Sequence, residues 1–181
     1  MEISAALILS VVIVNFNTRD LLRACLASIG KSEGIPAPEV IVVDNASTDG
    51  SAAMVASEYP WVRLIVSKVN GGYAYANNLA LKQCTGEYLL LLNPDTVLPP
   101  TALRRMLDFM DTHPEAGVAG PKLVRQNGNL DLACRRSFPS PEVSLYRMLG
   151  LSTLFPRSRR FGRYNLTYLD PDCPAEVDSV V

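Results

Sequence analysis

The sequence has few of the residues that build metal cages, disulfide frameworks or membrane spans. Its 181 residues include a single histidine, and none of the four cysteines forms a Cys-x-x-Cys pair, so a zinc site is not expected. The apolar run Ala5–Val14 contains Ser10 and has about half the length of a transmembrane helix. Because Glu2 precedes this run and Asn15 follows it, the run resembles a buried strand more than a signal peptide.

The chain also lacks an excess of charge of either sign. Seventeen basic residues against eighteen acidic ones give a net charge of -1, which argues against a broad nucleic-acid surface. A hydrophobic content of 48% with 19% charged residues is ordinary for a globular protein. Cys25 and Cys84 lie on apolar helix faces and are expected in the core, which indicates a reducing, cytoplasmic compartment.

Strand and helix patterns alternate through the first ~115 residues. Apolar runs rich in β-branched residues or leucine predict strands at 8–14, 39–43, 62–66 and 88–92. Between them, apolar residues at helical spacing predict helices, with Thr18 capping the first and Gly86 ending one over 73–84. This alternation predicts an α/β fold with a mainly parallel sheet and helices on both faces.

The pattern loosens beyond residue 116. We therefore expect an α/β domain over residues 1–116, followed over 117–181 by a smaller region of the same fold. Short strands are expected at 118–119 and 122–124, with a hairpin turn at Asn127-Gly128. Residues 177–181 have the composition of the opening of a further strand.

Polar groups follow each predicted strand. The four strands are followed by Asn15-Phe16-Asn17, Asp44-Asn45, Ser67-Lys68 and Asn93-Pro94-Asp95. In open parallel sheets, ligands bind beyond the carboxyl ends of the strands. An aromatic residue, two acids and a glycine-rich turn at that edge suit a nucleotide diphosphate with a metal ion.

Each group has a chemical role in such a site. Asp44 could accept the N3–H of a pyrimidine base, and Phe16 could stack on that base. The turn at 70–72 lets the backbone approach a ligand closely, and Asp95 could hold a divalent ion between two phosphates.

Structural interpretations compete with these roles. Asp44 could instead cap the next helix, and residues 93–95 could be a simple turn. Asn77 and Asn78 are more typical of a helix surface, and Phe16 is more typical of a core. The convergence of four segments on one edge favours the ligand site.

Four motifs, in this order, resemble the family-2 glycosyltransferases of the GT-A fold. They are Ser10–Asn17 (SVVIVNFN), Val42–Gly50 (VVDNASTDG), Asn70–Ala74 (NGGYA) and Leu92–Thr96 (LNPDT). The resemblance extends over nearly the whole chain, residues 155–163 included. Its branch, with Asn-Pro-Asp in place of Asp-x-Asp, contains many proteins assigned as bacterial rhamnosyltransferases.

The resemblance implies a Rossmann-like nucleotide-binding half joined to a smaller acceptor half, here incomplete. It implies a dTDP- or UDP-linked sugar donor, with Asp44 at the base and Asp95 at a Mg²⁺ or Mn²⁺ ion. Val14 and Phe16 match positions that line the nucleotide pocket. The expected donor site comprises Val14, Phe16, Asp44, Asn45, Gly71, Gly72, Asn77, Asn93 and Asp95.

The resemblance further implies transfer to a saccharide or lipid-linked acceptor with inversion at the anomeric carbon. The family's catalytic base belongs to an acidic motif that is expected beyond Val181, and none of Asp170, Asp172, Glu176 and Asp178 matches it. The basic cluster Arg157–Arg163 could face an anionic lipid or a polyprenyl diphosphate, which predicts peripheral association with the inner face of the membrane.

Three other functions fit parts of the sequence. A non-catalytic nucleotide-sugar-binding or assembly module would share the same donor site. A dinucleotide-dependent oxidoreductase fits the alternation, but Asn15–Thr18 stands where its Gly-x-Gly-x-x-Gly turn would follow the first strand. A sugar nucleotidyltransferase would carry a glycine-rich basic segment there, which is also missing.

Overall fold

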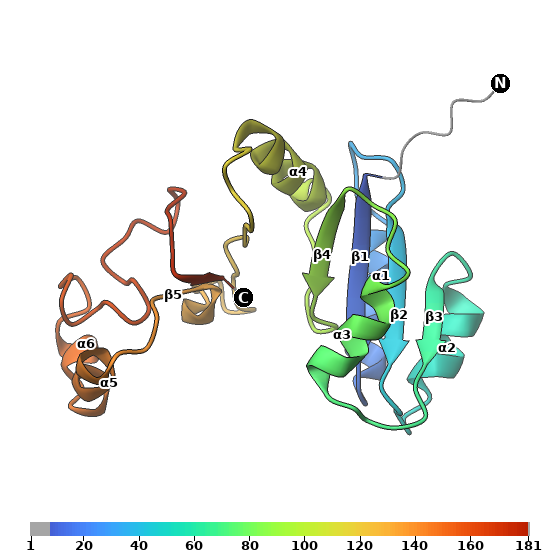
Figure 1. Cartoon of the computed structure of the whole chain (residues 1–181), viewed down its shortest axis with the longest axis horizontal. Coiled ribbons are helices and arrows are strands. Elements are labelled where there is room, and N and C mark those ends of the chain that lie inside the picture. Colours follow the sequence, from blue (N-terminus) through green and yellow to red (C-terminus); the bar gives the residue numbers. More distant parts are fainter. Residues whose placement is uncertain (1–7, 181) are drawn as a thin grey trace. The chain divides into compact units, whose positions relative to one another are not determined.

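The computed structural model describes residues 8–180 and divides the chain into two compact units. The first unit ends at Phe109 and the second begins at Met110. The first unit holds a parallel sheet with its helices, whereas the second unit is largely irregular chain (Figure 1).

The sheet of the first unit has four parallel strands. They are β1 (Leu9–Asn15), β2 (Glu39–Asp44), β3 (Arg63–Val66) and β4 (Tyr88–Leu92). The strand order is β3-β2-β1-β4, and the register places Asn15 opposite Asp44 and Ile13 opposite Leu92. The predicted parallel α/β architecture is therefore confirmed, with β1 between the two strands that carry the candidate acids.

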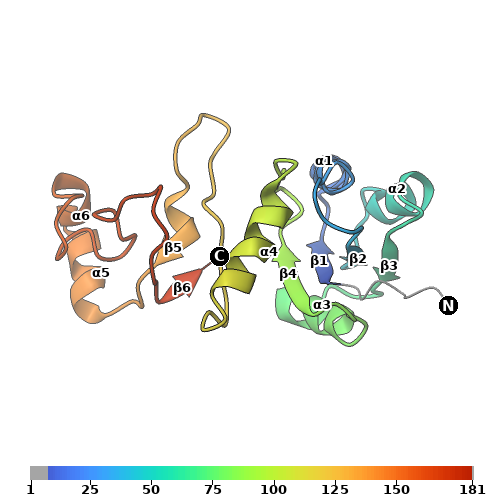
Figure 2. The same cartoon turned by 90° about the horizontal axis from the view of Figure 1, so that it is seen from above.

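Helices cover both faces of this sheet (Figure 2). Helices α1 (Arg19–Ile29) and α2 (Ser51–Glu58) pack on one face, and α3 (Tyr73–Leu81) packs on the other against β1 and β2. Helix α4 (Ala102–Thr112) follows β4. The strand order reverses between β1 and β4, and such a switch point is where open α/β sheets bind ligands.

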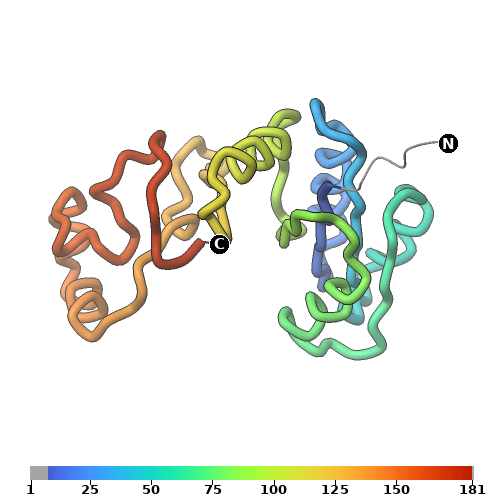
Figure 3. The backbone as a smooth tube through the Cα atoms, turned by 45° about the horizontal axis from the view of Figure 1, so that its top comes forward, coloured from blue at the N-terminus to red at the C-terminus, as the bar shows by residue number. Residues whose placement is uncertain are grey.

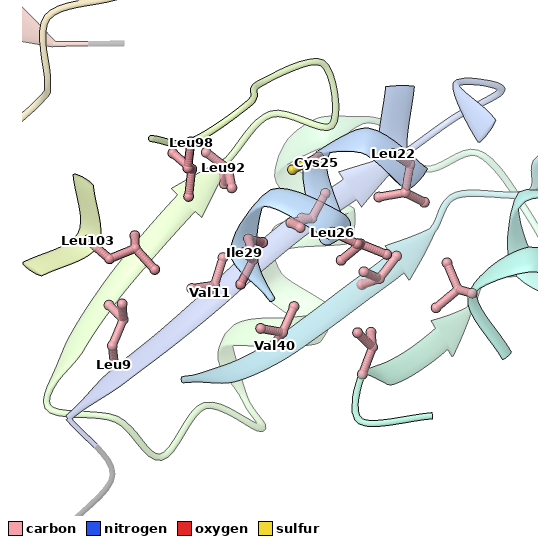
Figure 4. Packing of buried hydrophobic residues seen from close by; sticks show 14 of the residues in the cluster. Leu9, Val11, Leu22, Cys25, Leu26, Ile29, Val40, Leu92, Leu98 and Leu103 are labelled. Carbon is pink, nitrogen blue, oxygen red and sulfur yellow. The ribbon is translucent and has the colours of Figure 1, made fainter. Parts of the chain in front are cut away.

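Residues of β1 alternate between two apolar clusters. Val11 and Ile13 pack with α1, whereas Val12 and Val14 pack with α3. The predicted apolar stripe of α1, from Leu22 to Ile29, is buried in the first of these clusters (Figure 4). Each fully buried aliphatic side chain there contributes roughly 1.5–3 kcal/mol, so the two clusters hold the strand ends in place.

Two leucines of β4 depart from the expectation of a strand covered on both faces. Leu89 and Leu91 are 46% and 45% exposed, although they lie on the same face as Val12. Helix α3 packs mainly against β1 and β2 on that face. A run of consecutive leucines thus indicates a strand without showing which helices cover it.

The helix that begins at Tyr73 is shorter than the sequence predicts. It ends at Leu81 rather than Cys84, because the N–H groups of Gln83 and Cys84 bond three residues back, to Ala80 and Leu81. Such bonds tighten the last turn and redirect the chain. Cys84 is partly buried beside the α3 cluster, and Cys25 is fully buried, as expected.

The second unit contains short elements joined by long irregular segments (Figure 3). A 3-10 turn η1 (Leu132–Cys134), two helices and a two-stranded antiparallel sheet form it. The helices are α5 (Pro141–Met148) and α6 (Leu151–Leu154), and the strands are β5 (Arg135–Arg136) and β6 (Ser179–Val180).

Strands predicted at 118–119 and 122–124 do not form in the second unit. Only Val124 pairs, in an isolated bridge to Leu130 across the predicted turn at Asn127-Gly128. A lone bridge contributes too few hydrogen bonds and too little buried surface to extend into a ladder. Strand β6 begins within the expected 177–181 segment, and Val181 lies outside the described residues.

No helix among residues 8–180 is long and apolar enough to cross a membrane.

Glu39 anchors the amino-terminal edge of the sheet. Its Oε2 accepts hydrogen bonds from the Ser10 hydroxyl at 2.6 Å and the Thr85 N–H at 3.0 Å, and Arg63 lies 3.5 Å from Oε1. The Gly86 N–H also donates to Ser10 at 2.9 Å, and a Cβ at Gly86 would lie 2.6 Å from the Ser10 nitrogen. Burial alone raises the pKa of Glu39, but these hydrogen bonds and Arg63 outweigh burial and lower that pKa.

We expect Glu39→Gln to lower the free energy of unfolding at neutral pH by about 1–2 kcal/mol. A pKa lowered by folding stabilises the protein above the unfolded-state pKa, and this stabilisation disappears as the pH falls through the folded-state pKa. The difference between the parent and Glu39→Gln should therefore shrink below about pH 4.5. Urea unfolding across this range measures it, with the exposed Glu33→Gln as control; a pH-independent difference would contradict the assignment.

Candidate functional site

The buried amide of Asn15 joins the ends of β1 and β2. Its Nδ2 donates to Asp44 Oδ2 and to Ser47 Oγ, each at 3.0 Å, and its Oδ1 accepts from the Thr18 hydroxyl at 2.6 Å. Thr18 occupies the N-cap position of α1 but makes no side-chain cap bond, because its hydroxyl is used by Asn15. Thr18 is thus at the predicted N-cap position, but the prediction that its side chain caps the helix is wrong.

Two loops are tied together beyond this amide. Asn17, with φ of 54°, accepts the Thr48 N–H at 2.8 Å, and Asp49 accepts the Arg19 N–H at 2.8 Å. Ala46 also has a positive φ, of 66°. A left-handed conformation at a residue other than glycine is strained, and such strain concentrates at functional sites.

Asp44 is only 2% exposed and already has two partners. Its Oδ1 accepts the Ser47 N–H at 2.9 Å, in addition to the Asn15 bond on Oδ2. A carboxylate has about four acceptor positions, so Asp44 can accept further hydrogen bonds. Asp44 does not cap α2, whose N-cap residue is Gly50; the first N–H of the helix, that of Ser51, donates to Asp49 at 3.0 Å.

The end of β2 is also linked to the glycine turn before α3. Asn45 donates to Asn70 Oδ1 at 2.7 Å and accepts the Gly71 N–H at 3.2 Å. Gly72 has φ of 83° and ψ of 174°, a conformation that is essentially restricted to glycine. The turn is thus positioned by a strand-end side chain, and its geometry depends on the absence of a Cβ at Gly72.

Asn77 lies in the second turn of α3 and is buried, whereas Asn78 is exposed. The expectation of a helix-surface position is thus wrong for Asn77. Its Nδ2 donates to the Tyr73 carbonyl at 3.0 Å, and its buried Oδ1 has no partner among residues 8–180. Most buried acceptors are satisfied, so this unpartnered oxygen is an exception in the described part of the chain.

The loop after β4 packs on α1 and presents its acid to solvent. Asn93 and Asp95 are exposed, and the Cys25 thiol donates to the Asn93 carbonyl at 3.8 Å. Burial, together with the nearby Asp95 carboxylate, raises the pKa of Cys25 to about 12. Phe16, at the end of β1 between the two acid-bearing strands, is 47% exposed and does not belong to the core.

Asp44 and Asp95 therefore lie at the same edge of one sheet. Both β2 and β4 pair with β1 in parallel, so their carboxyl ends flank the end of β1. Two strand spacings correspond to about 10 Å between these backbones. Asn15 and Ser47 also belong to this edge, and the sequence analysis did not predict their roles. For Asn15, the signal that could have indicated its role is an asparagine at the end of an apolar strand.

The donor set at this edge suits a divalent ion shared with a ligand. Residues 8–180 contain no cluster of three or more histidine, cysteine, aspartate or glutamate side chains that could hold a metal by themselves. The exposed carboxylate of Asp95 is a hard oxygen ligand, and Mg²⁺ is commonly held by one or two carboxylates plus phosphate oxygens.

The basic cluster Arg157–Arg163 is only partly available. Arg160 donates to the Tyr146 hydroxyl at 2.7 Å and lies 3.4 Å from Glu142. Arg157, Arg159 and Arg163 are exposed.

Comparison with protein families and curated proteins identifies relatives of this chain. The family model described as Glycosyl transferase family 2 matches residues 10–173. An N-acetylglucosaminyl-diphospho-decaprenol L-rhamnosyltransferase from Mycobacterium tuberculosis is 27% identical over 91% of this chain. The poly(ribitol-phosphate) beta-N-acetylglucosaminyltransferase TarS from Staphylococcus aureus is 30% identical over 81% of it. The chain spans 56% of the first of these relatives and 26% of the second.

Solved structures with the GT-A fold are also similar. Residues 1–349 of S. aureus TarS in complex with UDP-GlcNAc match with a TM-score of 0.59 and 29% identity, over 75% of this chain and 38% of that one. The mannosyltransferase PcManGT from Pyrobaculum calidifontis, in complex with GDP-Man and Mn²⁺, matches with a TM-score of 0.54 and 26% identity, over 65% and 35%. These matches confirm the expected fold class.

We expect Asn15→Ala to lower the free energy of unfolding by about 2–3 kcal/mol. The change removes a hydrogen bond to the buried Asp44 carboxylate, leaves the Thr18 hydroxyl without its acceptor, and removes one of two donors to Ser47 Oγ. Urea unfolding monitored by circular dichroism measures the loss. Thr48→Ala, which leaves the backbone bond from Thr48 to Asn17 intact, is the control; equal stabilities of the two variants would refute the role of Asn15.

A second comparison tests the backbone of the glycine turn. Gly72→Ala should cost about 1–3 kcal/mol because φ of 83° with ψ of 174° is not accessible to alanine. Gly50→Ala, at φ of 84° and ψ of 10°, should cost less because that left-handed conformation tolerates a Cβ at a cost of roughly 1–2 kcal/mol. Thermal unfolding ranks the two, and the reverse order would be inconsistent with this geometry.

Proposed function

Because the chain belongs to glycosyl transferase family 2, we propose that it supplies the donor-binding part of an enzyme that transfers a sugar from a nucleotide-diphospho-sugar. The observation that carries this proposal is the placement of Asp44 and Asp95 at one sheet edge, on either side of the end of β1. This edge is at the topological switch point of the sheet, between β1 and β4.

The base of the nucleotide is assigned to the β1–β2 side. Asp44 accepts the N3–H of a pyrimidine on an oxygen position that Asn15 and Ser47 leave free. Phe16, half-exposed beside it, offers a ring face for stacking. Val14 and Asn45 complete this side of the site, and pyrimidine recognition selects a dTDP- or UDP-linked donor.

The diphosphate is assigned to the β4 side and the glycine turn. Asp95, with Asn93 beside it, would hold Mg²⁺ or Mn²⁺ against the phosphates. When bound, the ion offsets the negative charge that grows on the leaving nucleoside diphosphate. Gly71 and Gly72 let the backbone approach the donor, and the unpartnered Asn77 Oδ1 accepts from a donor hydroxyl.

The reaction is proposed to invert the anomeric carbon. An acceptor hydroxyl oxygen forms the new bond to C1 while the bond from C1 to the phosphate oxygen breaks, and a base takes the hydroxyl proton. That base is assigned to an acidic motif outside residues 8–180. L-Rhamnose is the proposed sugar, on the strength of the mycobacterial relative's name, and the proposed acceptor is a saccharide or lipid-linked glycan.

The proposed location is the cytoplasm, at the inner face of the membrane. Exposed arginines Arg157, Arg159 and Arg163 would attract anionic headgroups there. Vesicle sedimentation with all three replaced by glutamine tests this association, and unchanged binding would remove it.

Calorimetric titration of UDP and dTDP tests the donor site directly. We expect Mg²⁺ or Mn²⁺ to increase the affinity for the nucleotide. Asp95→Ala should reduce this metal-dependent increase in affinity at least about tenfold. Asp44→Ala should weaken nucleotide binding with or without metal, because its role is at the base.

The matched control is Asp108→Ala, an exposed aspartate on α4 that pairs with Arg104. It should leave both titrations unchanged. A folded sample that binds neither nucleotide, or an Asp95→Ala variant with an intact metal effect, would refute the donor-site assignment. A screen of sugar donors with the full-length protein, read by released nucleotide, then separates transfer from binding without turnover.

A further inference from the structure

The second unit contains an open cavity with an excess of positive charge. Arg125, Arg136, Arg147, Tyr164 and Asn165 line it together with Asp131, and its volume is about 310 Å³. Volumes of roughly 300–1,000 Å³ are typical of sites for small molecules. All of these residues belong to the same compact unit, which begins at Met110.

One acidic residue, Asp131, lines the cavity with the three arginines. The Ala133 N–H and the charges of both Arg125 and Arg136 lower its pKa. Arg125 Nη2 lies 3.2 Å from Asp131 Oδ1, and the Ala133 N–H donates to that same oxygen at 2.9 Å. Among residues 8–180, neither Arg136 nor Arg147 has an acidic side chain within ion-pair distance. The cavity thus carries about two uncompensated positive charges.

The position of Arg136 is set by its strand. Successive residues of a strand point to opposite sides, so Arg135 and Arg136 of β5 diverge. Arg135 donates to the carbonyls of Leu169 and Asp170, at 2.8 and 3.2 Å, whereas Arg136 lines the cavity. The Nε atoms of Arg135 and Arg136 are both buried without a partner in the described part of the chain, so the lining of the cavity by Arg136 is what distinguishes it.

Arg147 connects this cavity to a second, more apolar one. Its guanidinium lies 4.7 Å from the centre of the Tyr164 ring, and both residues also line a neighbouring cavity of about 450 Å³ with Pro139, Ser144 and Met148. This cation–π contact with Tyr164 holds the guanidinium in place.

An apolar stripe continues from the second cavity. Leu145 and Met148 share one face of α5 at i and i+3, Leu149 follows, and all three are exposed, Met148 by 85%. An exposed apolar stripe beside unpaired arginines is complementary to a molecule with an anionic head and an apolar chain.

We propose that this pair of cavities binds the phosphate or diphosphate head of an anionic lipid. Arg136 and Arg147 hold the phosphate oxygens, and the lipid chain lies along Leu145, Met148 and Leu149. Its residues belong to the second unit, whereas those of the donor site belong to the first. The role of this lipid as the glycosyl acceptor rests on the proposed function. The binding of the lipid to the arginines is independent of that function.

Titration of the full chain with farnesyl diphosphate tests the site, with inorganic diphosphate and farnesol as comparison ligands. Farnesyl diphosphate should bind at least about tenfold more tightly than either, because only it engages both arginines and the apolar stripe. Arg136→Gln and Arg147→Gln should each weaken its binding about tenfold or more, and the corresponding lysine variants should recover part of the loss. Met148→Ser should weaken the lipid but leave inorganic diphosphate unchanged.

The matched control is Arg105→Gln, an exposed arginine of helix α4 that lines neither cavity. Equal weakening by Arg105→Gln would mean general charge attraction and would overturn the site. Equal affinity for inorganic diphosphate would overturn the lipid assignment, and unchanged binding by folded Arg136→Gln and Arg147→Gln proteins would overturn the whole proposal. UDP titration of the parent and of the same variants separates the lipid site from the donor site. A parent protein that does not bind UDP would refute the donor site and leave the lipid site untouched.

Discussion

The candidate donor site depends on one buried side-chain amide. Asn15 ends the central strand without exposure to solvent, and its amide bonds the carboxylate at the end of β2 and the loops after both strands. A buried carboxylate without donors would be costly, and the Asn15 amide and the Ser47 N–H are the donors that support Asp44 at this edge. The identity of residue 15 therefore determines how the neighbouring acid is presented.

The sheet topology then determines which groups can meet. Because β1 lies between β2 and β4, the chain must cross over the sheet through α3 before β4 forms. The glycine turn that begins α3 is consequently bound to the end of β2 through Asn45. The two acids, the turn and the exposed Phe16 come from distant parts of the sequence, and parallel pairing brings them to one edge.

Much of this arrangement could be predicted from the sequence, and the failures have physical causes. Unbroken runs of β-branched residues predicted the strands, and apolar stripes predicted the helices. The polar residues that follow each strand predicted which edge of the sheet carries the candidate site. Leu89 and Leu91 were misjudged because burial depends on which strands α3 covers. Asn77 was misjudged because a polar residue in an amphipathic helix is normally exposed. The arginine cavity could not be foreseen, because irregular chain and a two-residue strand position its members.

The cysteines of the chain differ sharply in their environments. Cys25 is buried beneath the loop after β4, with a pKa of about 12, and Cys134 is also buried. Burial, and to a lesser extent the charge of Glu39, raises the pKa of Cys84. Cys173 alone of the four is exposed. Since thiolates are the species that react, a maleimide dye at neutral pH would attach selectively at Cys173. The native sequence thus offers a single labelling position in the second unit, where fluorescence could follow the proposed lipid site without engineered cysteines.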